Sequence, residues 1–299
     1  MLKSFDELLE LAVKKGTKKL AVAVAEDKEV LGAVGKAKKL GIADAILVGN
    51  SKKIEKVAEE IGLDLSLFEV IDESDGEKAC RTAVSLVSSG KADIVMKGII
   101  DTAVIMKQVL DKEIGLRSGK IISHVAVFSA PTYEKIFIVT DAAMNISPDL
   151  NQKMEILENA VTFAHSLDIE DPKVAVICAR EKVSPKMEAT IHAKELEEMN
   201  RNGKITGCTV AGPLALDNAI SKEAAIHKGI ESPVAGEADI LLVPAIEAGN
   251  VLYKSLTFFA EAKNAGLIIG TKAPIVLTSR SDSEEAKLYS IALGVLAAS

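Results

Sequence analysis

The chain has 299 residues, a formal net charge of −7 and a hydrophobic content of 48%. This length and content suffice for a large buried core, which excludes a disordered or fibrous protein. Lys and Arg are interspersed with acidic residues and form no runs, so the charge pattern argues against a nucleic-acid-binding protein.

Aromatic residues make up only 3% of the chain, and Trp is absent. The core must therefore consist mainly of Val, Ile, Leu and Ala, which is typical of parallel sheets and the helices that cover them. No apolar stretch approaches the roughly 18 residues that a membrane helix needs, and the first residues lack a secretory signal pattern. We therefore expect a cytoplasmic α/β protein without membrane contact.

Short apolar runs rich in Val and Ile alternate with segments of helical period along the chain. Most runs lack strict alternation of apolar and polar residues, which predicts strands covered on both faces by helices. A strong helical period spans residues 148–166, where we expect Pro148 to be the first helical residue after Ser147 as N-cap. In chain order, the predicted strands are residues 20–25, 45–48, 94–96, 125–128, 136–140, 174–178, 240–243 and 275–278.

No low-complexity linker divides the chain, but Pro- or Gly-containing stretches at residues 129–132 and 264–266 are candidate boundaries. We expect a first α/β lobe from residues 1–128 plus 267–299 and a second from residues 129–266. Clefts between lobes are common ligand sites.

Polar residues stand at the end of the last predicted strand and after it, in the order Thr278, Ser279, Arg280, Ser281 and Asp282, and a predicted helix comes next. The carboxyl end of a strand next to a helix N-terminus is a common ligand site, and an arginine there could bind phosphate. A structural alternative is a capping box formed by Ser281 with Glu284. That alternative leaves Arg280 unexplained, because a helix N-terminus gains nothing from a cation.

Weaker candidates also lie at predicted strand ends. Lys97 and Gly98 follow one strand, and the glycine would let backbone approach a ligand. Residues 141–145 and 247–254 follow two other strands. In each case an ordinary turn or helix start is an equally good explanation.

Several familiar site patterns are absent from the sequence. Residues 32–36 resemble a phosphate-binding loop but lack its spacing, and no GxGxxG motif follows a strand. The four histidines are scattered, so we expect no metal site.

From about residue 22 onward, the sequence resembles the phosphate acetyl/butyryltransferase family. The resemblance depends on residues 232–239, 247–250 with Tyr253 and Lys254, and the pair Ser279 and Arg280, with support from residues 49–50, 141–145 and Asp217. It implies two α/β lobes with largely parallel sheets and an interlobe cleft, as in isocitrate and isopropylmalate dehydrogenases. It also implies acyl transfer between coenzyme A and inorganic phosphate without metal or another cofactor, in a homodimer or higher homo-oligomer.

The acetyltransferase branch of this family carries a catalytic Asp at the position of Ala286, so the base here would be Asp282 or Glu285. Because of this and other departures, the sequence resembles the butyryltransferase branch more closely. The resemblance implies Ser279 as a third catalytic residue. The predicted phosphate and CoA ligands are Arg280, Thr278, Lys97, Gly98, Lys107, Asp141, Asn145, Asn250 and Lys254.

Three other functions stay open at this point. The first is acetyl transfer. The second is an oxidoreductase of the same two-lobed fold, which would need clustered aspartates and a nicotinamide site. The third is a catalytically silent CoA-binding protein, for which loss of Arg280 or of the nearby carboxylates would be typical.

Overall fold

The computed structural model describes residues 2–279 and 282–298, so the predicted site residues Arg280 and Ser281 lie outside it. The chain divides into unit 1, which contains Met1–Ser4 and Ile121–Asn264, and unit 2, which contains Phe5–Lys120 and Ala265–Ser299. The sequence-based division assigned residues 121–128 to the other lobe. They form most of β5 (Ser123–Ser129), whose antiparallel pairing with β6 (Phe137–Thr140) holds them in unit 1.

Unit 2 contains the strand order β3-β2-β1-β4-β11-β10, in which neighbours up to β11 run parallel and β10 runs antiparallel to β11. Strands β1, β2, β4 and β11 are mostly buried and consist mainly of aliphatic residues, as expected for strands covered on both faces. The bounds are β1 (Lys18–Ala23), β2 (Ala43–Gly49), β3 (Glu69–Asp72), β4 (Ile94–Lys97), β10 (Lys263–Ile269) and β11 (Ile275–Val276).

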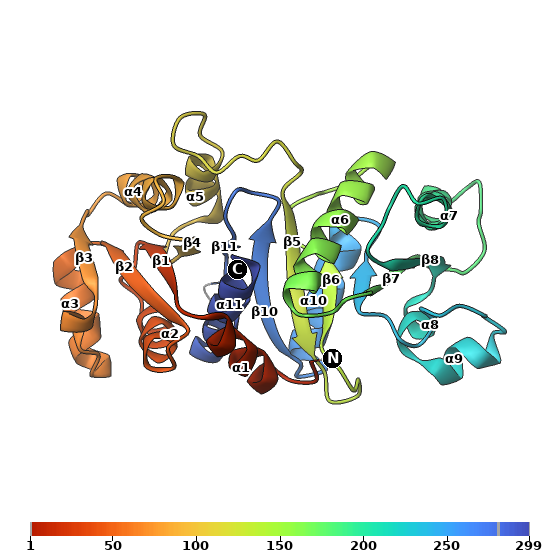
Figure 1. The fold of residues 1–299 in the computed structure, drawn as a ribbon, viewed down its shortest axis with the longest axis horizontal. Coiled ribbons are helices and arrows are strands. Elements are labelled where there is room, and N and C mark those ends of the chain that lie inside the picture. Colours follow the sequence, from red (N-terminus) through yellow and green to blue (C-terminus); the bar gives the residue numbers. More distant parts are fainter. Residues whose placement is uncertain (1, 280–281, 299) are drawn as a thin grey trace. The chain divides into compact units, whose positions relative to one another are not determined.

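The helices of unit 2 cover both faces of its sheet. Helices α1, α2 and α11 pack together on one face, and α4 and α5 pack together on the other (Figure 1). The bounds are α1 (Phe5–Lys15), α2 (Lys28–Lys39), α3 (Ser51–Ile61), α4 (Gly76–Ser88), α5 (Thr102–Val109) and α11 (Glu284–Ala297), with a 3-10 turn at η1 (Leu65–Leu67).

Unit 1 contains the strand order β5-β6-β9-β7-β8, in which β6, β9, β7 and β8 run parallel. Helix α7 lies on one side of β7 and β8, and α8 and α9 lie on the other (Figure 1). The remaining bounds are α6 (Leu150–Ser166), β7 (Lys173–Ile177), α7 (Glu188–Arg201), β8 (Thr209–Leu214), α8 (Leu216–Ile220), α9 (Lys222–His227), β9 (Ile240–Leu242) and α10 (Ile246–Phe258).

The predicted α/β class with largely parallel sheets is confirmed, and each predicted strand is present with shifted ends. Strands β3, β8 and β10 were not predicted. Their sequences explain this, because β3 is a half-exposed edge strand, β8 contains Gly212 and Pro213, and β10 begins with the polar pair Lys263 and Asn264. The start predicted for the long helix was also wrong: Asp149 is the N-cap of α6 and forms a capping box with Gln152.

Candidate active site

The carboxyl ends of β1 and β4 lie side by side at the point where the chain reverses its direction across the sheet of unit 2. The chain places β1, β2 and β3 in one direction and then returns to place β4 on the other side of β1. Ligands of open α/β sheets bind outside the carboxyl ends of the strands at such a switch point. Lys97 ends β4 and Gly98 follows it, so both predicted residues lie at this position.

Gly98 allows two backbone segments to approach closely. A Cβ atom at this position would lie 2.0 Å from the carbonyl oxygen of Val24, which is too close for any side chain. The N–H of Gly98 donates to Ala23 O at 2.8 Å, and the N–H of Ile99 donates to Val24 O at 2.9 Å. Glycine is therefore required here to join the ends of β1 and β4.

Lys97 places a cation at the same strand end. Its side chain is buried, and its ammonium donates to the carbonyls of Gly98 at 3.2 Å and Ile100 at 3.1 Å. Burying an ammonium is costly unless donors and acceptors are matched. This cation thus fixes the turn after β4 while it remains at the edge where ligands bind.

The predicted segment after β11 lies at the same edge, because β11 runs parallel to β4. Thr278 is buried and Ser279 is exposed. The N–H of Ser279 donates to the Asp282 carboxylate at 2.7 Å, and the N–H of Asp282 donates to Ser279 O at 3.2 Å. Asp282 therefore shapes the loop that carries Ser279.

The cap of α11 differs from the predicted capping box. Ser283 is the N-cap, and its hydroxyl accepts from the N–H of Ala286 at 3.2 Å. The Glu284 carboxylate instead forms an ion pair with Lys36 at 2.7 Å. Glu285, in the first turn of the helix, is exposed and accepts a hydrogen bond from the Tyr289 hydroxyl at 2.6 Å.

Glu26 is a residue at this edge that the sequence reasoning missed. One of its oxygens accepts from the N–H of Asn50 at 3.1 Å, and the other is buried without a hydrogen-bond partner among the residues described. Gly49 makes room for this carboxylate, since a Cβ there would lie 2.4 Å from Glu26 Oε2. Glu26 follows β1 by three residues, but the sequence does not show that Gly49 makes room for its carboxylate.

Lys107 lies apart from these contacts, on α5. Its side chain is 70% exposed, and its ammonium forms an ion pair with Glu77 at 2.6 Å. The described contacts therefore link it to α4 and not to Lys97.

In unit 1, the loop after β6 is organised around the Asp141 carboxylate. This side chain is buried, and one oxygen accepts from the N–H groups of Ala143 and Met144, both at 2.9 Å. The other oxygen accepts from the Asn145 amide at 2.6 Å, and that amide also donates to Ile122 O at 2.9 Å. The structure thus brings the predicted residues Asp141 and Asn145 together as supports of one loop.

Helix α10 packs its first turns against that loop. Asn250 donates to Ala142 O at 3.4 Å, and Gly249 allows the approach because a Cβ there would lie 2.7 Å from Asp141 O. Lys254 lies one turn further along α10 and is exposed, with its ammonium 5.3 Å from the centre of the Tyr253 ring. Asn250 therefore joins the loop of Asp141, and Lys254 extends from the same helix.

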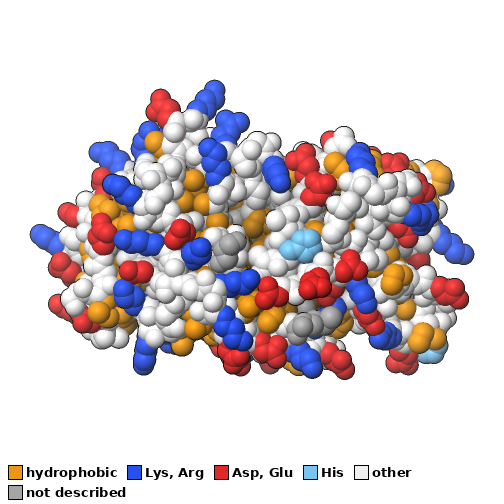
Figure 2. All heavy atoms as spheres, viewed as in Figure 1, with side chains coloured by type: hydrophobic (Ala, Val, Ile, Leu, Met, Phe, Trp, Pro, Cys, Tyr) orange, Lys and Arg blue, Asp and Glu red, His pale blue; other side chains and the backbone are white. Residues whose placement is uncertain are grey.

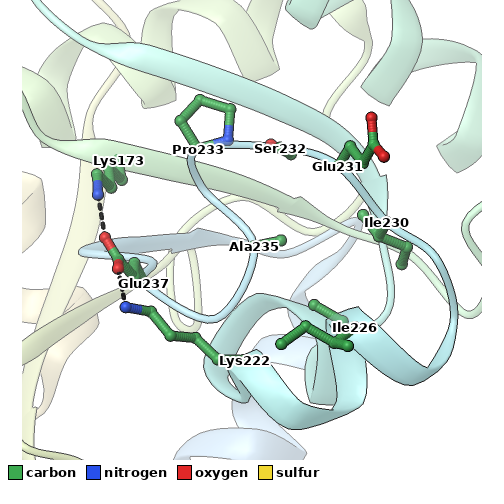
Figure 3. Close-up of a pocket in the computed structure, with 10 residues that line it drawn as sticks. Lys173, Lys222, Ile226, Ile230, Glu231, Ser232, Pro233, Ala235 and Glu237 are labelled. Carbon is green, nitrogen blue, oxygen red and sulfur yellow. Dashed lines mark hydrogen bonds and ion pairs between the residues drawn. The ribbon is translucent and has the colours of Figure 1, made fainter.

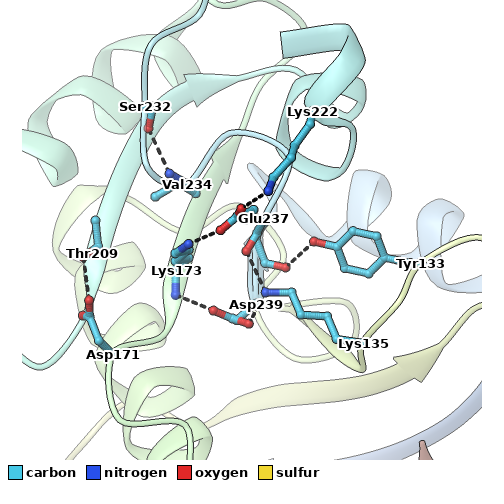
Figure 4. A network of polar contacts seen from close by, with 11 residues as sticks. Tyr133, Lys135, Asp171, Lys173, Thr209, Lys222, Ser232, Val234, Glu237 and Asp239 are labelled. Carbon is cyan, nitrogen blue, oxygen red and sulfur yellow. Dashed lines mark hydrogen bonds and ion pairs between the residues drawn. The ribbon is translucent and has the colours of Figure 1, made fainter. Parts of the chain in front are cut away.

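The motif at residues 232–239 lies at the opposite, amino edge of the unit 1 sheet, just before β9. Asp239 accepts from the N–H of Lys173 at 2.8 Å and pairs with the buried Lys135, which also donates to Glu237 O at 2.7 Å (Figure 4). Tyr133 donates to Ala238 O at 2.8 Å. This network fixes the starts of β7 and β9, which gives the motif a structural role.

A pocket of about 410 Å³ lies beside this motif (Figure 3). Its polar wall is formed by Glu237 with Lys173 and Lys222, which pair with it from two sides, and Ile226 and Ile230 form an apolar wall. Hydrogen bonds from Lys173 and Lys222 lower the pKa of Glu237 to about 2. Glu231 also lines the pocket, so two carboxylates balance the two ammonium groups and the pocket offers phosphate no net positive charge.

Two further features of the described residues concern metal ligands and thiols. Within residues 2–279 and 282–298, no three His, Cys, Asp or Glu side chains lie close enough together to hold a metal ion. No helix in these ranges is long and apolar enough to cross a membrane. Cys80, Cys178 and Cys208 are buried, and burial raises the pKa of each thiol to about 11, which makes them poor nucleophiles. Acidic and basic side chains are mixed on the face shown in Figure 2, without a basic stripe.

The family model described as "Phosphate acetyl/butaryl transferase" matches residues 4–83 and 75–295. The chain is 53% identical to phosphate butyryltransferase of Clostridium acetobutylicum over 298 residues, which cover 100% of this chain and 99% of the relative. It is 48% identical to phosphate acetyltransferase of Thermotoga maritima, over 97% of this chain and 98% of the relative. The crystal structure of a branched-chain phosphotransacylase from Enterococcus faecalis V583 matches with a TM-score of 0.83 and 40% identity, over 94% of this chain and 99% of the other. The expectation from the sequence motifs is confirmed: the chain belongs to the phosphate acetyl/butyryl transferase family.

Proposed function

We propose that this chain transfers a butyryl group reversibly between coenzyme A and inorganic phosphate, giving butyryl phosphate and CoA. The full-length identity to the clostridial butyryltransferase is the observation that supports this most. The polar groups at the carboxyl edge of unit 2 supply chemistry that suits the reaction, and the description of the Enterococcus relative as a branched-chain phosphotransacylase agrees with an acyl group longer than acetyl.

In the forward reaction, a phosphate oxygen attacks the thioester carbonyl. The new C–O bond forms as the C–S bond breaks, and CoA leaves as a thiolate that takes a proton. The Ser279 hydroxyl and the Lys97 ammonium are the donors we assign to the developing negative charge, and one such donor is typically worth about 3 to 4 kcal/mol. Thr278 and Gly98 lie at the same carboxyl edge of the unit 2 sheet. The role of Arg280 in binding phosphate stays a prediction.

In the reverse reaction, the CoA thiol must lose its proton before it attacks the acyl phosphate. A thiol with a pKa of about 8.5 is mostly protonated at neutral pH, so a positioned carboxylate would speed the step. Asp282 and Glu285 are the candidates. For Asp141, Asn145 and Asn250 we propose support of a substrate-binding loop, and an active site that combines both units stays a prediction.

Acetyl transfer is the second candidate, because a relative named phosphate acetyltransferase is nearly as similar as the butyryltransferase. The test is phosphate-dependent release of free thiol from acetyl-CoA, butyryl-CoA and longer acyl-CoA, measured at matched concentrations. We expect the highest kcat/KM with butyryl-CoA. A preference for acetyl-CoA would select the alternative, and absence of release from every thioester would refute acyl transfer.

We also propose a homo-oligomer that associates through the end of α10. Phe258 and Phe259 there are 69% and 91% exposed, and Val251 on the same helix is 66% exposed. Large apolar side chains that gather on a surface are typical of protein interfaces. The cytoplasmic location expected from the sequence stays a prediction.

A further inference from the structure

Tyr289 and Glu285 form a hydrogen-bonded pair on α11. They are four residues apart and therefore share one face of the helix, and the Tyr289 hydroxyl donates to Glu285 Oε1 at 2.6 Å. Glu285 is exposed, whereas Tyr289 is only 3% exposed. A buried hydroxyl thus holds a carboxylate at the surface.

The position of the Tyr289 ring is fixed by packing against α1. It stacks on Phe5 with ring centroids 4.3 Å apart and an interplanar angle of 16°. Phe5 is itself buried. An exposed glutamate ordinarily samples several rotamers, so a donor anchored in the core restricts the Glu285 carboxylate to fewer orientations.

The other two carboxylates of this segment already have structural roles. The Asp282 carboxylate accepts a hydrogen bond from the N–H of Ser279. The backbone carbonyl of Asp282 accepts a hydrogen bond from the ammonium of the buried Lys287. Glu284 pairs with Lys36. Since Ser283 caps α11, Glu285 is not needed as a cap, and it is the exposed carboxylate of the three.

We infer that Glu285 is the base of the thiol step and that Tyr289 is its positioning residue, an assignment that depends on the proposed acyl transfer. As the CoA sulfur attacks the carbonyl carbon of the acyl phosphate, its proton passes to Glu285, the C–S bond forms, and the C–O bond to phosphate breaks with the electron pair on phosphate. In the opposite direction, protonated Glu285 returns the proton to the departing thiolate. No oxidant or covalent enzyme intermediate takes part.

The test is a double-mutant cycle with Glu285→Gln, Tyr289→Phe and the double variant, measured by thiol consumption with butyryl phosphate. Glu285→Gln should lower kcat by about 10² to 10⁴-fold with little change in KM for CoA. Tyr289→Phe should lower kcat about tenfold and add nothing to the loss in Glu285→Gln, because it acts through that residue. The hydrogen bond from Tyr289 stabilises the ionised form of the Glu285 carboxylate. Its removal in Tyr289→Phe should therefore move the acidic limb of the pH–rate profile to higher pH.

Tyr133→Phe is the matched control, because it removes a tyrosine hydroxyl that donates to Ala238 O in unit 1, and it should leave kcat unchanged. Asp282→Asn should lower the melting temperature and raise KM, as expected for a loop-shaping residue. Full turnover in Glu285→Gln, or a loss from Tyr289→Phe that is additive with it, would overturn the assignment. A wild-type protein without phosphate-dependent acyl transfer would instead refute the proposed function, and the base assignment with it.

Discussion

Replacing Glu237 by Gln tests whether the motif at residues 232–239 is structural. The two lysines that pair with this carboxylate lower its pKa from 4.5 to about 2. Since one pKa unit corresponds to about 1.4 kcal/mol, the shift sets a ceiling of roughly 3 kcal/mol on its contribution to folding. The Lys222 and Glu237 side chains are 67% and 35% exposed, so water screens the pairs, and we expect a loss of about 1 kcal/mol.

The contribution of Glu237 to folding stability depends on pH. A carboxylate whose pKa is lowered by folding stabilises the protein above its unfolded-state pKa, and that contribution disappears as the pH falls towards 2. Denaturant unfolding should therefore show Glu237→Gln less stable than wild type at about pH 7 and equally stable at about pH 2 and below. Turnover of butyryl-CoA should stay within about twofold of wild type. Equal stability at neutral pH, or a large loss of activity in a stable variant, would refute the structural role.

Three further changes probe unit 2 and α10. Gly98→Ala should destabilise the protein by about 3 kcal/mol or more, because the new Cβ would meet the backbone carbonyl of Val24. Gly76→Ala is the control and should cost much less, because its Cβ would meet the flexible end of the Ile100 side chain. Thermal unfolding of the two variants compares these costs. Lys97→Met should lower kcat/KM about 10²-fold. Lys194→Met, which loses a partly buried pair with Glu197 on α7, should not, and equal effects of the two changes would contradict the role of Lys97. Phe258→Ser combined with Phe259→Ser should reduce the molar mass measured by light scattering with size-exclusion chromatography, and an unchanged mass would refute this interface.

Much of the candidate site was selected from the sequence by one criterion, namely a position at the carboxyl end of a predicted strand. Lys97, Gly98 and Thr278 were selected because they end or follow predicted strands, and parallel pairing brings them to one edge of the sheet. Asp141 and Asn145 were selected in the same way and do meet, although as supports of a loop. Residues at these positions come together because the carboxyl ends of parallel strands share an edge of the sheet, whatever the side chains between them.

Residues that depend on packing over long sequence distances could not be predicted. Glu26 owes its place to the missing Cβ of Gly49, and a sequence does not reveal which glycine faces which carboxylate. The binding role of Lys107 stays a prediction, and the sequence did not show that its ammonium pairs with Glu77 from the preceding helix. Such pairings follow from how helices α4 and α5 pack, which periodicity alone does not give.

The carboxylate at the start of α11 illustrates the same limit for mechanism. The sequence left Asp282 and Glu285 as alternatives, because Ala286 stands where relatives of the acetyltransferase branch carry their catalytic Asp. Their environments separate them, since Asp282 binds the backbone of its own loop while Glu285 is held by a tyrosine that stacks on Phe5. That stacking partner comes from the first helix of the chain, so no local motif at residues 278–289 could have shown which carboxylate is fixed from the core. Proton transfer depends on such fixed orientation, and for this reason the Tyr289→Phe cycle tests the mechanism more directly than removal of either carboxylate alone.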